Sequence, residues 1–172
     1  MSEPLEAQVG DLLRQRGLRL AVAESCTGGL IGHRLTNVPG SSDYFVGGVI
    51  AYANETKMSL LGVSQATLEK HGAVSKETAL EMARGVRAAL QADIGLSVTG
   101  IAGPSGGTPS KPVGTVWIGL SSRTKEHASH FQWPGDRLAV KEQSAQAALD
   151  ILWQYLQENE KTHKRGELDF QR

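Results

Sequence analysis

The chain of 172 residues has the length of one ordinary domain, and 40% of its residues are hydrophobic, which is enough for one substantial core. Its 18 lysines and arginines balance 18 aspartates and glutamates, so the formal net charge is zero. That balance argues against nonspecific binding to nucleic acid, which requires a basic excess. It leaves room for a small anionic ligand, because a few local donors are enough to hold one.

Targeting and membrane-spanning patterns are missing from the sequence. The first ten residues carry Glu3 and Glu6 and lack the basic start and apolar run of a signal peptide. No apolar stretch approaches the roughly 20 residues that a membrane helix needs. The single cysteine, Cys26, leaves no intramolecular disulfide possible. We therefore expect a cytoplasmic protein without a membrane or nucleic-acid partner.

The first third of the chain alternates between helical and strand patterns. Apolar residues at helical spacing predict a first helix that ends at Gly17, and a buried strand is expected over 18–23. The helical pattern resumes over 30–36. A second strand is expected over 46–53, and a short helix follows over 54–61.

The middle of the chain continues this alternation. Ser64 caps a further turn that ends near Gly72, and Ser75 caps a clearly amphipathic helix. A third strand is expected over 94–98. The Gly-, Pro- and Ser-rich segment 100–112 is a long loop for so compact a chain, and we interpret it as a flexible wall or lid of a binding site.

The last third predicts a hairpin followed by one long helix. Strands are expected over 113–121 and 126–133, and Asp136 caps the final helix. Alternating strands and helices favour parallel pairing, whereas the late hairpin adds an antiparallel edge. The predicted fold is a three-layer α/β/α sandwich with a mixed, mostly parallel sheet. We expect one domain over 1–158 and a polar, mobile tail over 159–172.

Polar residues follow three of the predicted strands. Ser25 follows the first strand, Tyr52 and Asn54 end the second, and Thr99 and Gly100 end the third. In open α/β sheets, ligands bind outside the carboxyl ends of the strands. We therefore expect these residues to meet at one crevice.

Ser25 is the candidate nucleophile. It stands at a predicted strand-to-helix turn and is followed by Thr27, Gly28 and Gly29, whose N–H groups would be suited to an oxyanion or a phosphate. The alternative is that Ser25 serves only as a helix N-cap. The pattern by itself leaves both interpretations open.

A serine nucleophile requires a base. None of the five histidines falls at the carboxyl end of a predicted strand, so the sequence gives little support to a Ser-His-Asp triad. Lys57 lies one turn into the helix after the second strand, and a desolvated lysine can become a neutral base. The ordinary alternative for Lys57 is an exposed helical lysine. Tyr52 is suited either to donate to a substrate or to pack on the sheet surface.

Two cations lie one turn apart at the start of the final helix. Arg137 and Lys141 are placed to bind a phosphate together, although each would also be ordinary as a solvent-exposed residue. His127 and His130 point to opposite faces of a predicted strand and make a poor metal pair. Because no Cys, His or carboxylate cluster has metal-site spacing, we expect neither a metal nor another cofactor.

Six short motifs carry a resemblance to a known family. Their order along the chain agrees with the CinA C-terminal domain family, and in particular with the stand-alone nicotinamide-nucleotide amidohydrolases. The resemblance extends from about residue 8 to residue 156. The motifs are AESCTGG at 23–29, AYANETK at 51–57, HGAVS at 71–75, TGIAGP at 99–104, KPVGTV at 111–116 and GDR at 135–137.

This resemblance implies deamidation of nicotinamide mononucleotide to nicotinic acid mononucleotide and ammonia. It implies that Ser25 is the nucleophile and Lys57 the base. Tyr52 and Thr99 match positions that line the substrate site, and Arg137 matches a position near the substrate phosphate. The family also suggests a homodimer.

One departure and two alternatives accompany this interpretation. Lys141 stands where the family often has arginine, which removes bidentate phosphate geometry but keeps the charge. The oxyanion would be held by backbone N–H groups of the turn over 26–29. The first alternative is a hydrolase with Cys26 as nucleophile, activated beside a helix start. The second is a catalytically inactive nucleotide-binding or partner-binding domain of the same fold.

Overall fold

A five-stranded sheet forms the centre of the molecule. The computed structural model describes residues 3–169, with side chains described up to Glu158. The strand order is β2-β1-β3-β4-β5, with β1 parallel to β2 and β3, and β4 antiparallel to β3 and β5. The strands are β1 (Leu20–Glu24), β2 (Phe45–Ile50), β3 (Ile94–Gly100), β4 (Thr115–Ser122) and β5 (Glu126–Gln132).

The sheet is mixed, as predicted, but it is not mostly parallel, since two of its four strand pairs are parallel and two are antiparallel. The reason lies in the connection after β3. The loop 100–112 contains no helix to carry the chain back across the sheet, so β4 returns antiparallel to β3.

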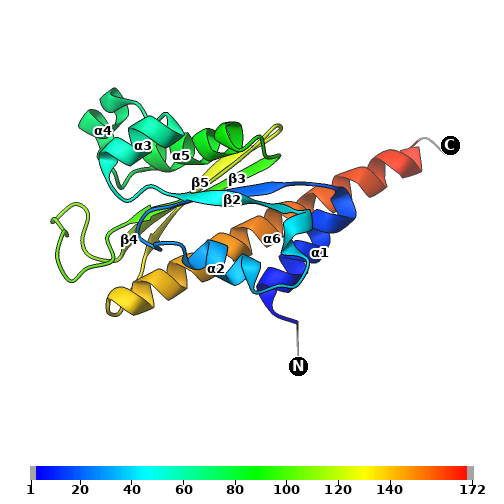
Figure 1. The fold of residues 1–172 in the computed structure, drawn as a ribbon, viewed down its shortest axis with the longest axis horizontal. Helices are drawn as coiled ribbons and strands as arrows, with labels where there is room; N and C mark the ends of the chain where they lie inside the picture. The colour runs from blue at the N-terminus through cyan, green and yellow to red at the C-terminus, as the bar shows by residue number, and fades with distance from the viewer. Residues whose placement is uncertain (1–2, 170–172) are drawn as a thin grey trace.

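Helices cover both faces of the sheet (Figure 1). One face carries α3, α4 and α5, and the other carries α1, α2 and α6. Within the described part of the chain, no helix is long and apolar enough to cross a membrane. The helices are α1 (Leu5–Arg16), α2 (Leu30–Thr36), α3 (Asn54–Leu61), α4 (Gln65–His71), α5 (Lys76–Ala89) and α6 (Arg137–Asp169), and a short 3-10 helix spans Ser41–Asp43.

Local capping chemistry places several helix ends where the sequence predicts them. The hydroxyl of Ser64 accepts from the N–H of Thr67 at the start of α4, and Ser75 plays the same part for α5. A carboxylate oxygen of Asp136 accepts from the N–H of Ala139 at 2.9 Å in the first turn of α6. These bonds satisfy N–H groups that have no partner inside the helix.

The backbone of α6 continues to Asp169, past the expected domain end at residue 158. The predicted domain end and the predicted mobility of the tail over 159–172 therefore stay predictions, and residues 170–172 lie outside the described part of the chain.

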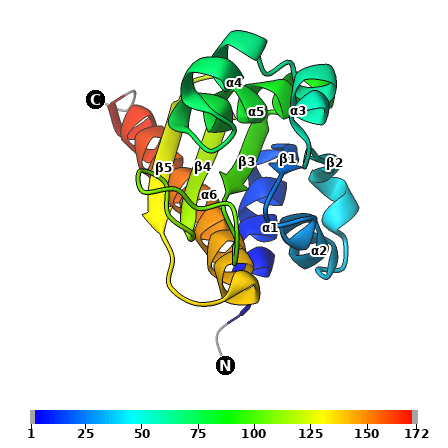
Figure 2. The same ribbon diagram turned by 90° about the vertical axis from the view of Figure 1, so that its left-hand side faces the viewer.

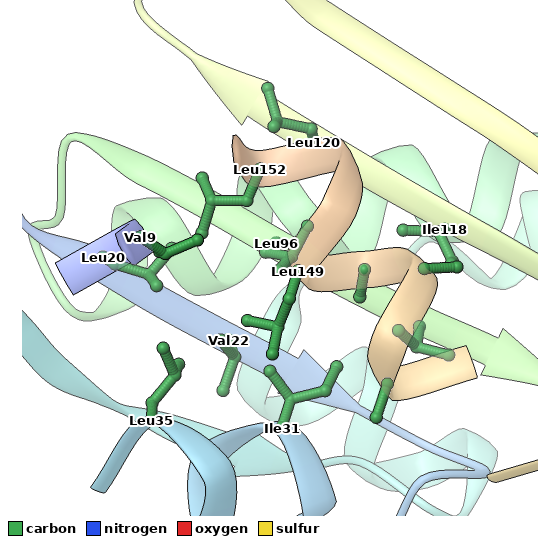
Figure 3. Close-up of a cluster of buried hydrophobic side chains, with 14 of the residues drawn as sticks. Val9, Leu20, Val22, Ile31, Leu35, Leu96, Ile118, Leu120, Leu149 and Leu152 are labelled. Atoms are coloured by element: carbon green, nitrogen blue, oxygen red, sulfur yellow. The ribbon is translucent and has the colours of Figure 1, made fainter. Parts of the chain in front are cut away.

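The larger core cluster fills the space between the sheet and the layer formed by α1, α2 and α6 (Figure 3). Every residue of β1 is buried, as expected for a central strand with helices on both faces. A buried aliphatic side chain contributes about 1.5–3 kcal/mol through apolar burial. The side chains labelled in the view include Leu20, Val22, Leu96, Ile118, Leu149 and Leu152.

The carboxyl ends of β1, β2 and β3 open toward one edge of the sheet. Figure 2 shows the loop that follows β3 passing beside the start of α6 at this edge. Gly85 in α5 permits the approach of α3, because a Cβ at this position would overlap the carbonyl oxygen of Leu61. The packing of α3 on α5 thus fixes the position of the predicted lysine base.

Candidate active site

Ser25 and Lys57, far apart in the sequence, lie in contact. Lys57 Nζ is 3.1 Å from Ser25 Oγ, and the two residues are 1% and 7% exposed, respectively. The N–H of Ser25 donates to the carbonyl of Val98 at the end of β3. Ser25 is not the N-cap of α2, which begins after Gly29. The alternative that Ser25 serves only as a helix N-cap is therefore wrong. The alternative that Lys57 is an exposed helical lysine is wrong as well.

The Lys57 amine is hydrogen-bonded to two backbone carbonyl groups. Its Nζ is 2.7 Å from the carbonyl oxygen of Ala51 and 3.1 Å from that of Tyr52. Among the described side chains, no carboxylate forms an ion pair with it. Burial therefore lowers the pKa of Lys57 below its ordinary value. In the neutral amine, two N–H bonds can serve the two carbonyls, and the lone pair can then face Ser25 Oγ.

The turn after Ser25 offers fewer free donors than the sequence predicts. Gly28 (φ 62°) and Gly29 (φ 103°) adopt left-handed backbone conformations that favour glycine. The N–H of Gly28 donates to the Ser25 carbonyl, and that of Gly29 donates to the Glu24 carboxylate. Within the described residues, the N–H groups of Cys26 and Thr27 donate to no oxygen. The N–H groups of Cys26 and Thr27 are therefore the remaining candidates to bind the oxyanion.

Cys26 lies in surroundings that suppress its reactivity. The residue is only 4% exposed, and burial raises the pKa of its thiol to about 12. The thiolate, which is the nucleophilic form, is therefore scarce at neutral pH. Its sulfur lies 3.1 Å from the point where Gly100 would carry a Cβ, so Gly100 leaves it room. These features argue against the alternative with Cys26 as nucleophile.

Arg137 connects two walls of the site. Its guanidinium donates to Tyr52 Oη at 2.9 Å and to the carbonyl of Gly103 in the long loop at 2.8 Å. Tyr52 is 61% exposed, so its ring does not pack in the hydrophobic core. Lys141, one turn further along α6, places Nζ 3.6 Å from the point where Gly28 would carry a Cβ. Lys141 therefore lies beside the serine turn, whereas Arg137 lies between Tyr52 and the long loop.

Of the other residues predicted to bind substrate, Thr99 is held by a backbone contact and Asn54 is exposed to solvent. Thr99 is 1% exposed and donates its hydroxyl to the carbonyl of Ala73 at 2.7 Å, which ties the end of β3 to the segment before α5. Asn54 is exposed at the start of α3. In the long loop, Lys111 Nζ donates to the carbonyl of His71 at 2.6 Å. The loop is thus anchored from both sides.

Sequence reasoning assigned no role to Glu24. This residue is 2% exposed, and its carboxylate accepts a hydrogen bond from the Thr27 hydroxyl and three from backbone N–H groups. One signal was available in the sequence, because a carboxylate that directly follows a buried apolar strand needs polar partners.

Two further observations concern other places where a ligand would be expected. In the part of the chain that the structure describes, no three His, Cys, Asp or Glu side chains gather as a metal site would require. A surface hollow of about 400 Å³ lies between α2 and α6 and contains none of the predicted site residues. It is lined by Arg34, Trp133, Glu142, Gln143, Gln146, Ala147 and Asp150.

Comparisons with solved structures agree with this fold. A CinA superfamily protein from Klebsiella pneumoniae aligns with a TM-score of 0.86 and 34% identity over 90% of this chain and 96% of that chain. The competence/damage inducible protein CihA from Agrobacterium tumefaciens aligns with a TM-score of 0.81 and 35% identity, over 88% of this chain and 96% of that one.

Sequence comparisons point the same way. A CinA-like protein from Salinibacter ruber is 57% identical over 146 residues, which are 85% of this chain and 35% of the relative. A putative competence-damage inducible protein from Moorella thermoacetica is 52% identical over 154 residues, 90% of this chain and 37% of the relative. The chain thus spans little more than a third of the length of these relatives. The CinA C-terminal domain model matches residues 2–156, so the chain belongs to the CinA C-terminal domain family.

Proposed function

We propose that this protein hydrolyses the carboxamide of nicotinamide mononucleotide, with Ser25 as nucleophile and Lys57 as base. The observation that carries the proposal is the buried contact of 3.1 Å between Lys57 Nζ and Ser25 Oγ. The CinA family is linked to this deamidase activity, which supports the choice of substrate. The lowered pKa of Lys57 favours the neutral amine that a base requires.

Acylation begins when the Lys57 amine takes the proton of Ser25 Oγ–H as Oγ bonds to the carboxamide carbon. The N–H groups of Cys26 and Thr27 stabilise the oxyanion that forms. The Lys57 ammonium then returns its proton to the amide nitrogen, the carbon–nitrogen bond breaks, and ammonia leaves. An acyl ester on Ser25 remains.

Deacylation repeats the sequence with water. Lys57 takes a proton from a water molecule whose oxygen bonds to the ester carbon, and the tetrahedral intermediate collapses with release of Ser25 Oγ. The proton held by Lys57 returns to Oγ, and nicotinic acid mononucleotide leaves, its carboxylic acid giving up its proton to water or to the released ammonia. Each proton taken in one step is therefore returned in another, and the protein ends unchanged.

The cations at the start of α6 would hold the substrate phosphate. Lys141 lies beside the serine turn and Arg137 lies between Tyr52 and the long loop, so we expect a phosphate held by both cations to anchor a carboxamide near Ser25. Arg137 would exchange its bonds to Tyr52 and Gly103 for bonds to the phosphate oxygens. Binding of this remote group orients the carboxamide and lowers the entropic cost of the attack.

The test is ammonia release from nicotinamide mononucleotide by purified protein with excess chelator. We expect wild-type protein to release ammonia, and Ser25→Ala to lose about a thousandfold or more of the rate while keeping its fold. Cys26→Ser should keep most of the activity. Activity that disappears with chelator would contradict the metal-free mechanism. A well-folded wild-type protein that binds the nucleotide without turnover would support the alternative of an inactive binding domain.

The predicted homodimer is a separate proposal. Analytical ultracentrifugation of the purified chain would test it, with a twofold mass expected.

A further inference from the structure

The carboxylate of Glu24 organises the turn that follows β1. Its Oε2 accepts from the Thr27 hydroxyl at 2.6 Å and from the N–H groups of Gly29 and Ile31 at 3.1 Å. Its Oε1 accepts from the N–H of Gly32 at 2.8 Å. The N–H groups of Ile31 and Gly32 in the first turn of α2 therefore find their acceptor in a side chain that precedes Ser25, rather than in a conventional N-cap.

The backbone around Glu24 is fixed as well. The N–H of Ala51 donates to the Glu24 carbonyl at 2.8 Å, while the carbonyl of Ala51 accepts from Lys57 at 2.7 Å. The N–H of Ser25 is bonded to Val98 at 3.0 Å. A chain of hydrogen bonds thus connects the backbone of Glu24 through Ala51 to Lys57, and Lys57 in turn contacts Ser25, the residue next to Glu24.

These bonds sort the N–H groups of the turn into two sets. Glu24 occupies the N–H groups of Gly29, Ile31 and Gly32. The N–H groups of Cys26 and Thr27 keep no oxygen partner among the described residues. Because the Glu24 carboxylate accepts these hydrogen bonds and faces the positive end of the helix dipole, the N–H groups next to Ser25 stay available for a substrate oxygen.

We propose that Glu24 is a positioning residue for the reaction. It holds the turn so that Ser25 Oγ stays against Lys57 and the N–H groups of Cys26 and Thr27 stay free for the oxyanion. This inference rests on the proposed role of Ser25 as nucleophile. Glu24 reaches the chemistry only through the turn and takes no proton in the reaction.

Two substitutions of Glu24 probe this role. Glu24→Gln keeps the size of the side chain but replaces one acceptor oxygen with an amide that donates, which opposes the N–H groups it faces. Glu24→Asp keeps the charge on a side chain shorter by one methylene, so it reaches only some of the four donors. We expect kcat to fall about tenfold or more in both, with KM within about twofold, because the turn shifts while the phosphate cations stay in place.

Thr27 provides a milder pair of variants in case changes at Glu24 prevent folding. Thr27→Val removes one of the four donors and keeps the shape of the side chain, whereas Thr27→Ser keeps the hydroxyl. We expect kcat to fall in Thr27→Val and to recover in Thr27→Ser. The control is Ser64→Ala, which removes the N-cap of α4, a helix of seven residues like α2, and should leave kcat unchanged.

Amide hydrogen exchange measured by NMR gives a readout that does not depend on activity. The N–H groups of Gly29, Ile31 and Gly32 should exchange slowly in wild type and faster in Glu24→Gln. If they exchange faster while kcat stays within about twofold of wild type, the Glu24 bonds serve stability alone and the proposal fails.

Failure of the proposed function would look different. If Ser25→Ala kept full activity, Ser25 would not be the nucleophile, and a crystal structure of Glu24→Gln would then decide whether Glu24 positions the turn. A displaced Ser25 that has lost its contact with Lys57 would uphold that role. An undisplaced Ser25 would overturn it.

Discussion

Replacement of Lys57 by methionine separates the two consequences of its burial. Methionine has a similar length and fills the same space without an amine. The variant should lose ammonia release, because Ser25 then has no base. It should also change how stability depends on pH, and this second effect can be measured without substrate.

The size of the effect follows from one proton. Burial lowers the pKa of folded Lys57 below the ordinary lysine value of 10.5, so between these two pKa values the unfolded chain binds up to one proton more. In that window the unfolding free energy of wild type rises with pH by up to about 1.4 kcal/mol per pH unit. Above 10.5 the amine is neutral in both states, and the penalty for burying its charge is gone.

A second contribution does not depend on pH. In the variant, the buried carbonyl of Ala51 loses its donor at 2.7 Å, which costs about 1–3 kcal/mol. The difference in unfolding free energy, wild type minus variant, should therefore be smallest below the folded-state pKa and should rise to a plateau above 10.5. Other titrating groups cancel in this difference.

The assay is urea unfolding of both proteins at intervals from pH 6 to about pH 11, with the difference plotted against pH. A difference that stays flat across this range would mean that Lys57 has the same pKa in the folded and unfolded states. A difference that falls with pH would mean that folding raises this pKa. Either result would refute the neutral-amine argument.

Three further outcomes are expected. The kcat/KM for nicotinamide mononucleotide should rise with pH and then level off, since only neutral Lys57 accepts the Ser25 proton. A pH–rate profile checks this, and the midpoint of the rise should lie below pH 10.5. Gly85→Ala should place a methyl group against the Leu61 carbonyl, displace α3, and cost about 1–3 kcal/mol in urea unfolding together with a lower kcat. Arg137→Ala should weaken the reaction of the mononucleotide and hardly change any residual ammonia release from free nicotinamide, and equal rates on the two compounds in wild type would remove the nucleotide from the proposed function.

The secondary structure was largely predictable because its signals are local. The strand signals, and cap residues such as Ser64, Ser75 and Asp136, act within a few residues of their own positions, and each predicted helix and strand is present. The pairing of the sheet was less predictable, since it depends on how the chain returns after β3. The antiparallel pairing of β4 with β5 was predicted as a hairpin, but that of β4 with β3 was not, although the Gly-, Pro- and Ser-rich loop between them carries no helical pattern.

The sequence by itself determined the class of fold and the meeting of polar residues at one edge of the sheet, because parallel strands bring their carboxyl ends together. Only the tertiary structure decided which of these residues are buried and what they contact. Lys57 is an ordinary helical lysine in sequence. Its lowered pKa arises because α3 buries it against Ser25, with no carboxylate partner among the described side chains. The donors that Glu24 occupies likewise become visible only once the turn is folded, since hydrogen bonding and desolvation depend on neighbours in space rather than in sequence.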